Sequence, residues 1–167
     1  MSAIEVIFYI MAAVAVLSAI GVVSARNPVY SALFLVVTLF SLAVLFVLLK
    51  AEFLAIIQIL TYAGAILVLF VFIIMLLNLK PDELVEKGYG SAMKFLIGAA
   101  SLGLFLILGY VFHFAKWEAP ELAAGFGNAA AVGKEIFTHY VVPFEVSGVL
   151  LTVALVGAVV LAKRKLD

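Results

Sequence analysis

The sequence predicts an all-α integral membrane protein whose chain crosses the bilayer five times. Of its 167 residues, 68% are hydrophobic and only 12% are charged, whereas a soluble domain is about half apolar and about a quarter charged. The apolar residues form five uncharged runs, and a helix needs roughly 20 such residues to cross the hydrocarbon core. The spans must be helices, because unpaired backbone groups are too costly in lipid.

The first predicted span is preceded by an acid, Glu5, and not by a basic residue. Its apolar run is also too long for a signal peptide, so we interpret it as a retained helix. Asn27 and Pro28 start the second span, as N-cap and first helical residue. Pro81 follows the third span, and Pro143 opens the fifth. The predicted spans cover residues 6–25, 28–49, 53–79, 95–115 and 143–162.

All 167 residues are expected to form a single membrane domain, because neither a soluble domain nor an internal repeat is detectable. The segment of residues 116–142 is the only sizeable one between spans. We expect it to be an outer loop with a short interfacial helix near residues 129–140, anchored by Trp117 and Tyr140. It also contains three glycines, Gly125, Gly127 and Gly133.

The distribution of basic residues predicts the orientation, with the N-terminus outside and the C-terminus inside. In that orientation seven basic residues lie on the inner side and three on the outer side, as the positive-inside rule requires. The inner residues are Arg26, Lys80, Lys87, Lys94, Lys163, Arg164 and Lys165, and the outer residues are Lys50, Lys116 and Lys134.

Several kinds of chemistry are not expected of this chain. Without cysteines it has no thiolate metal site and no cysteine nucleophile. His113 and His139 are far apart in sequence, and no phosphate-binding loop is present. The zero net charge gives no indication of nucleic acid. We therefore predict no catalytic residue, no cofactor and no metal in the chain itself, and the lipid bilayer as its surroundings.

The third span carries the most informative polar residues. Gln58, Thr61 and Tyr62 recur at helical spacing and form one polar stripe. Polar groups at that depth should face protein or water. The adjoining Gly64 has two interpretations: a small-residue site for helix packing, or a helix irregularity such as a π-bulge that re-aims Tyr62.

Glu145 is the second candidate. If Pro143 is the first helical residue, Glu145 lies in the first turn, where the helix N-terminus stabilises a carboxylate. Alternatively, it is a partly buried carboxylate that exchanges protons or pairs with another subunit. Gly148 and Thr152 continue its face, so we expect Glu145 to face protein.

Charged residues are nearly absent from the five spans, whereas pumps and transporters usually carry ionisable groups near mid-membrane. The residues alone therefore favour a helical partner within a larger assembly over a complete transporter.

Three stretches resemble one family. Residues 27–33 read Asn-Pro-Val-Tyr-Ser-Ala-Leu, residues 57–72 contain Tyr62-Ala63-Gly64-Ala65, and residues 143–158 begin Pro-Phe-Glu-Val. Together they resemble subunit J of bacterial NADH:quinone oxidoreductase (respiratory complex I), the counterpart of mitochondrial NADH dehydrogenase subunit six. The resemblance covers all five spans but not the loop of residues 116–142.

The resemblance implies a membrane-arm subunit of an enzyme that passes electrons from NADH to a quinone and drives protons across the membrane. Flavin and iron–sulfur clusters would belong to other subunits. The partners would be the quinone-site subunit, other small membrane subunits and antiporter-like subunits, in a bacterial inner (cell) membrane.

In this family the third helix carries a π-bulge that interconverts with α-helix and gates a water path. The resemblance thus places a hinge at Tyr62, Ala63 and Gly64. A glutamate in the last helix of the family matches Glu145. The alternatives are a small free-standing channel or transporter, which would not co-purify with a flavin- and iron-containing assembly, and a structural scaffold, whose third-span variants would not impair coupling.

Overall fold

The computed structural model describes residues 2–77, 90–115 and 125–163. In this part of the chain, five helices are long and apolar enough to cross a membrane. They are α1 (Ala3–Ser24), α2 (Pro28–Leu48), a third helix (Glu52–Leu77), α5 (Ser91–Phe114) and α7 (Val141–Ala162). The predicted all-α fold with five spans is therefore confirmed.

Local capping explains where the first two helices begin. Ser2 and Glu5 form a capping box, in which each side chain accepts a hydrogen bond from the backbone N–H of the other. Asn27 caps α2, because its Oδ1 accepts from the N–H of Val29 over 2.9 Å, and Pro28 is the first helical residue. The predicted start of the second span is thus correct.

The last helix begins two residues earlier than predicted. Tyr140 is its N-cap and Val141 its first residue, so Pro143 is the third helical residue and not the first. Proline is tolerated there because the first N–H groups of a helix have no intrahelical acceptor. Glu145 consequently lies beyond the first turn, and its predicted place at the helix N-terminus is wrong.

Helices α1 and α2 form a tightly packed antiparallel pair. The hydroxyls of Ser18 and Thr38 are hydrogen-bonded over 2.8 Å, and the Ser31 hydroxyl donates to the Val22 carbonyl over 2.7 Å. Such bonds between helices help hold membrane helices together, where water cannot compete for the polar groups.

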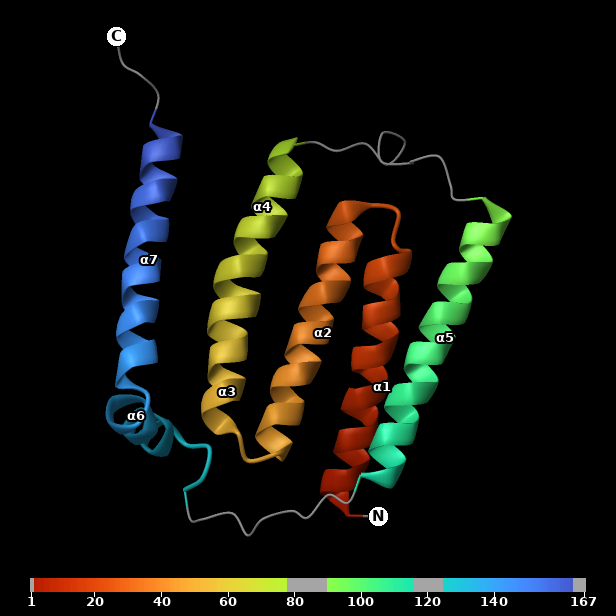
Figure 1. Ribbon diagram of the computed structural model, residues 1–167, viewed down its shortest axis with the longest axis horizontal. Helices are drawn as coiled ribbons and strands as arrows, with labels where there is room; N and C mark the ends of the chain where they lie inside the picture. Colours follow the sequence, from red (N-terminus) through yellow and green to blue (C-terminus); the bar gives the residue numbers. More distant parts are fainter. Residues whose placement is uncertain (1, 78–89, 116–124, 164–167) are drawn as a thin grey trace.

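The third helix packs on the other side of α2, so α1, α2 and the third helix lie side by side in one layer (Figure 1). Ala32 of α2 is buried together with Leu67 and Ile74 of the third helix. These three residues form the small apolar core that holds the third helix against α2.

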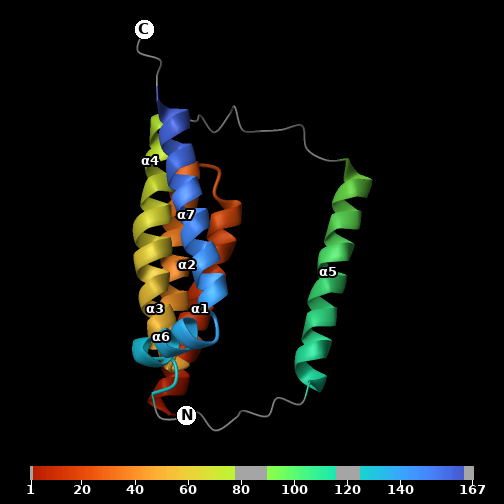
Figure 2. The ribbon, with the colours of Figure 1, turned by 60° about the vertical axis from the view of Figure 1, so that its left-hand side comes forward.

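The remaining elements surround this layer loosely. Helix α6 (Ala129–Thr138) contacts both the beginning of the third helix and the adjacent α7. It lies below α7, beside the beginning of the third helix (Figure 1). Figure 2 shows α5 standing apart from the other helices, and none of its residues is buried. The helix expected in the outer loop is therefore present.

Some predicted features lie outside the described residues. These are the last two residues of the predicted third span, the interfacial Trp117, and the basic residues Lys80, Lys87, Lys116, Arg164 and Lys165.

Candidate functional site: the π-helical segment of the third helix

The third helix changes its hydrogen-bonding pattern along its length. It consists of α3 (Glu52–Ile57), a nine-residue π-helical segment η1 (Gln58–Ile66) and α4 (Leu67–Leu77). At the end of η1, the N–H of Leu67 donates to the carbonyl of Tyr62, five residues earlier and not four. The π-bulge expected in this helix is confirmed.

The π-helical segment has a geometric consequence for packing. Ala55 in α3 and Leu67 in α4 are both buried, at 4% and 3% exposure, and both flanks pack against α2. In an unbroken α-helix, residues twelve positions apart differ by about 120° in direction. If the π-helical segment accommodates one extra residue, the spacing counts as eleven, which is about three full turns. The irregularity thus lets both flanks turn toward α2.

Gly64 lies inside η1, where a side chain would be crowded. A Cβ added to Gly64 would lie 3.3 Å from the carbonyl oxygen of Ile59, the residue five positions earlier. That carbonyl is one that five-residue pairing brings opposite Gly64. The missing side chain therefore avoids one tight contact with the π-helical backbone.

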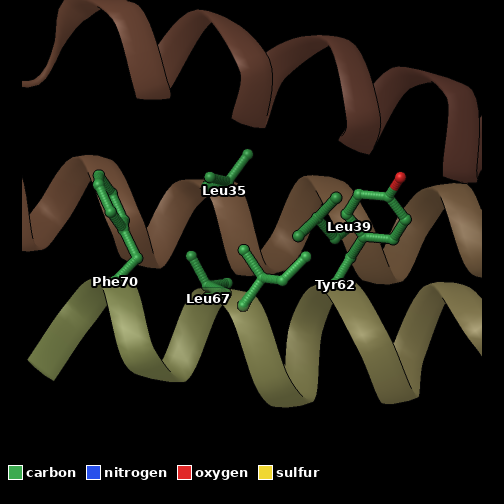
Figure 3. A pocket seen from close by; sticks show the side chains of 6 residues that line it. Leu35, Leu39, Tyr62, Leu67 and Phe70 are labelled. Atoms are coloured by element: carbon green, nitrogen blue, oxygen red, sulfur yellow. The ribbon is translucent and has the colours of Figure 1, made fainter. Parts of the chain in front are cut away.

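An apolar pocket of about 330 Å³ lies between α2 and the third helix, directly beside η1. Figure 3 shows the side chains of Tyr62 and Phe70 rising from the third helix toward α2, with Leu67 between them. The Tyr62 hydroxyl points away from its own helix. The pocket is lined by Leu35, Leu39, Tyr62, Ile66, Leu67 and Phe70.

All the residues of the predicted hinge and polar stripe fall within η1. Gln58 is half-buried, whereas Thr61 and Tyr62 are exposed, Tyr62 at 49%. Within the described residues, no hydrogen bond joins their side chains. Exposed polar groups in a membrane span call for water or another protein chain beside them.

Glu145 does not belong to this site. It lies near the start of α7 and is exposed on this chain. Thr152, on the same helix, uses its hydroxyl to donate to the Gly148 carbonyl over 2.9 Å. Among the described residues, nothing covers that face of α7.

The site contains little reactive chemistry. The third helix carries no charged residue between Phe53 and Leu77. Among the described residues, no group of three His, Cys, Asp or Glu side chains could hold a metal ion. What the site offers is a backbone with five-residue pairing, beside a tyrosine hydroxyl.

One residue of structural importance was not singled out from the sequence. Gly127, in the loop before α6, has a left-handed backbone with φ +78° and accepts a hydrogen bond from the start of α3. The nearby Gly125 and the capping residue Asn128 mark a turn before a helix. They give no indication of where that turn would dock.

The fold and the site define a class of protein: a small multi-pass membrane protein with a π-helical segment in an uncharged span. Residues 18–161 match the family described as NADH-ubiquinone/plastoquinone oxidoreductase chain 6. The chain therefore belongs to this family and is a subunit of an NADH:quinone oxidoreductase complex.

Individual relatives agree with this assignment over nearly the whole chain. The chain is 35% identical to NADH-quinone oxidoreductase subunit J of Rickettsia bellii, over 97% of this chain and 82% of that protein. Identity to subunit J of Buchnera aphidicola is 38%, over 96% and 99%. Identity to the NAD(P)H-quinone oxidoreductase chain 6 of Nostoc is 37%, over 95% and 78%.

Proposed function

We propose that η1 acts as a hinge in the membrane arm of a proton-translocating NADH:quinone oxidoreductase and helps couple quinone reduction to proton pumping. The observation that carries this proposal is the nine-residue π-helical segment in mid-span, which contains Tyr62, Ala63 and Gly64. π-Helical segments are rare and occur frequently at functional sites. A switch needs two states that are close in energy. In this proposal the two states are five-residue pairing and four-residue pairing of the same segment.

The proposed hinge moves a polar group. A change from five-residue to four-residue pairing turns one flank of the helix relative to the other, and Tyr62 lies where the turn occurs. Its hydroxyl would then face either the apolar pocket beside α2 or the chain or water on the opposite side. In a nearly uncharged span, the position of such a hydroxyl can complete or interrupt a hydrogen-bonded chain of water molecules.

The subunit would lie between the quinone-site subunit and the antiporter-like subunits, next to other small membrane subunits. The open surfaces of α5 and α7 support contacts with such partners, because the described residues leave both helices uncovered. Flavin and iron–sulfur clusters would belong to other subunits, since this chain has no cysteine to supply thiolate ligands. We place the complex in a bacterial cell membrane.

Imaging of the native complex tests the hinge. Particles of the complex during NADH–quinone turnover should separate into two classes. In one, Leu67 would pair with Tyr62, and in the other η1 would have regular α-helical pairing. A single class with five-residue pairing under turnover and at rest would contradict the proposal. Purification of a tagged chain without flavin and iron would contradict the assignment to the complex.

A further inference from the structure

The beginning of the third helix, its outer end in the predicted topology, is capped by a distant part of the chain. Phe53 is the second residue of α3, so its N–H has no acceptor within the helix. The N-cap residue, Ala51, makes no side-chain capping bond. Instead, the Phe53 N–H donates to the carbonyl of Gly127 over 3.0 Å. A residue 74 positions further along the chain thus supplies the missing cap.

Gly127 fits this place only because it lacks a side chain. Its φ of +78° is one that other residues rarely adopt. A Cβ on Gly127 would also collide with the carbonyl oxygen of Lys50 and lie 3.1 Å from the Cα of Ala51. Lys50 itself has a left-handed backbone, with φ 61°. The turn between α2 and α3 and the loop before α6 are therefore shaped to fit each other.

The cap is attached to a folded element and not to a free loop. The Asn128 side chain accepts from the N–H of Ala131 over 2.8 Å and so starts α6. The Asn128 N–H also donates to the carbonyl of Gly125 over 3.2 Å, which closes the turn. Helix α6 in turn contacts both α3 and α7. Residues 125–128 consequently hold the beginning of α3 against α6.

We propose that Gly127 is a positioning residue for the hinge. It keeps α3, the outer flank of η1, from rotating about the helix axis. The inference rests on the proposed function of η1. Phe53 precedes the first residue of η1, Gln58, by only five positions. Whatever fixes Phe53 therefore fixes the outer flank of the π-helical segment.

The geometry of the helix indicates which flank must move. A shift of pairing by one residue turns one flank relative to the other by about 100°, and this displaces a Cα by about 3.5 Å at a helix radius of about 2.3 Å. The bond between Phe53 and Gly127 cannot survive such a displacement of α3. The inner flank, α4, is held by apolar packing of Leu67 and Ile74, which has no directional requirement. The motion is therefore carried by α4.

The test uses the whole complex in membranes and the variant Gly127→Ala. Without the cap, hydrogen exchange at the amide of Phe53 should rise at least tenfold. The outer flank would then turn with the hinge, so quinone-linked turnover should fall two- to fivefold relative to NADH oxidation with an artificial acceptor. Gly133→Ala, on α6, is the matched control, because an added Cβ there meets nothing within 4 Å. It should leave both values unchanged.

Two further variants keep the test decisive. Gly127→Asn introduces a residue that tolerates a left-handed backbone, but it also adds the colliding Cβ. It should therefore behave like Gly127→Ala. If Gly127→Ala fails to assemble, Asn128→Ala, which only loosens the turn, should give a smaller rise in exchange at Phe53.

Three results would overturn the inference: wild-type exchange at Phe53 in assembled Gly127→Ala, an equal rise in Gly133→Ala, or increased exchange with unchanged relative turnover. If Asn128→Ala has to be used, wild-type exchange there would also overturn it. Failure of the hinge proposal itself would look different. Variants of η1 would then leave relative turnover unchanged, whatever the exchange at Phe53.

Discussion

The amide of Leu67 donates to the carbonyl of Tyr62, five residues earlier, in the middle of a helix that crosses the membrane. Regular α-helical pairing would direct this amide to Ala63. A shift by one residue therefore separates the observed pairing from the ordinary one. Tyr62 and Leu67 both line the apolar pocket beside α2, so the shift would change the shape of this pocket.

The first prediction concerns topology. The excess of basic residues on one side predicts that the N-terminus is outside and the C-terminus inside. Figure 1 shows the beginning of α1 and the end of α7 at opposite ends of the helices, as an odd number of spans requires. A reporter fused after Asp167 should be active only on the cytoplasmic side. Since the chain has no cysteine, one introduced near the N-terminus gives a clean label, and labelling from the cytoplasm alone would contradict the prediction.

The second prediction is that the chain has no enzymatic activity on its own. It has no nucleotide-binding motif, and the described residues contain no group of potential metal ligands. Purified without its partners, it should neither oxidise NADH nor reduce a quinone. Intact complex at equal molar concentration provides the positive control. Quinone reduction by the pure chain would show that a redox site has been overlooked.

The third prediction concerns Glu145. The side chain is exposed on α7, and we expect it mainly to orient packing against a neighbouring subunit. Glu145→Gln keeps its size and most of its hydrogen bonds, so it should retain most proton pumping. Pumping per NADH oxidised is the measurement, at matched complex content. Complete loss of pumping in a fully assembled complex would instead assign proton transfer to this carboxylate.

The fourth prediction concerns the packing of α1 on α2. A Cβ added to Gly21 would lie 2.7 Å from atoms of the Phe34 ring. Gly21→Ala should therefore push the two helices apart at a cost of about 1–3 kcal/mol. The amount of assembled complex in membranes should fall, and Phe34→Leu in the same chain should restore part of it. Wild-type assembly in Gly21→Ala would mean that the ring moves aside freely.

The membrane architecture could be predicted almost completely from the sequence, because it follows from uncharged runs and local capping signals. Asn27 and Pro28, for example, start α2 as their residue types require. The start of α7 was misplaced because proline suits the whole first turn of a helix, and Pro143 alone cannot distinguish between these positions.

The candidate site was only partly predictable. Helical spacing predicts that Gln58, Thr61 and Tyr62 lie in one polar stripe. It allows two interpretations of Gly64, and the family resemblance favours the π-bulge. The pairing of Leu67 with Tyr62, and the nine-residue length of η1, are seen only in the structure, where η1 and both its flanks contact α2. The cap of Phe53 by Gly127 joins residues 74 positions apart, and no local pattern encodes such a contact.

Gly64 is expected to permit the change of pairing on which the proposed hinge depends. A β-branched residue at Gly64 would crowd the Ile59 carbonyl, already only 3.3 Å from an added Cβ, and should disfavour the π-helical state by about 1–3 kcal/mol. A bias of about 1.4 kcal/mol already changes the ratio of two states tenfold. Gly64→Val should therefore impair function without preventing assembly.

The most direct measurement compares Gly64→Val and wild-type membranes at equal NADH oxidation with an acceptor that bypasses quinone. Gly133→Ala, on α6, is again the control, since an added Cβ there meets nothing within 4 Å. Gly64→Val should lower quinone-linked turnover and proton pumping several-fold, and the control should not. If Gly64→Val keeps wild-type quinone turnover and wild-type pumping per NADH, Gly64 is only a packing residue and η1 is not a hinge.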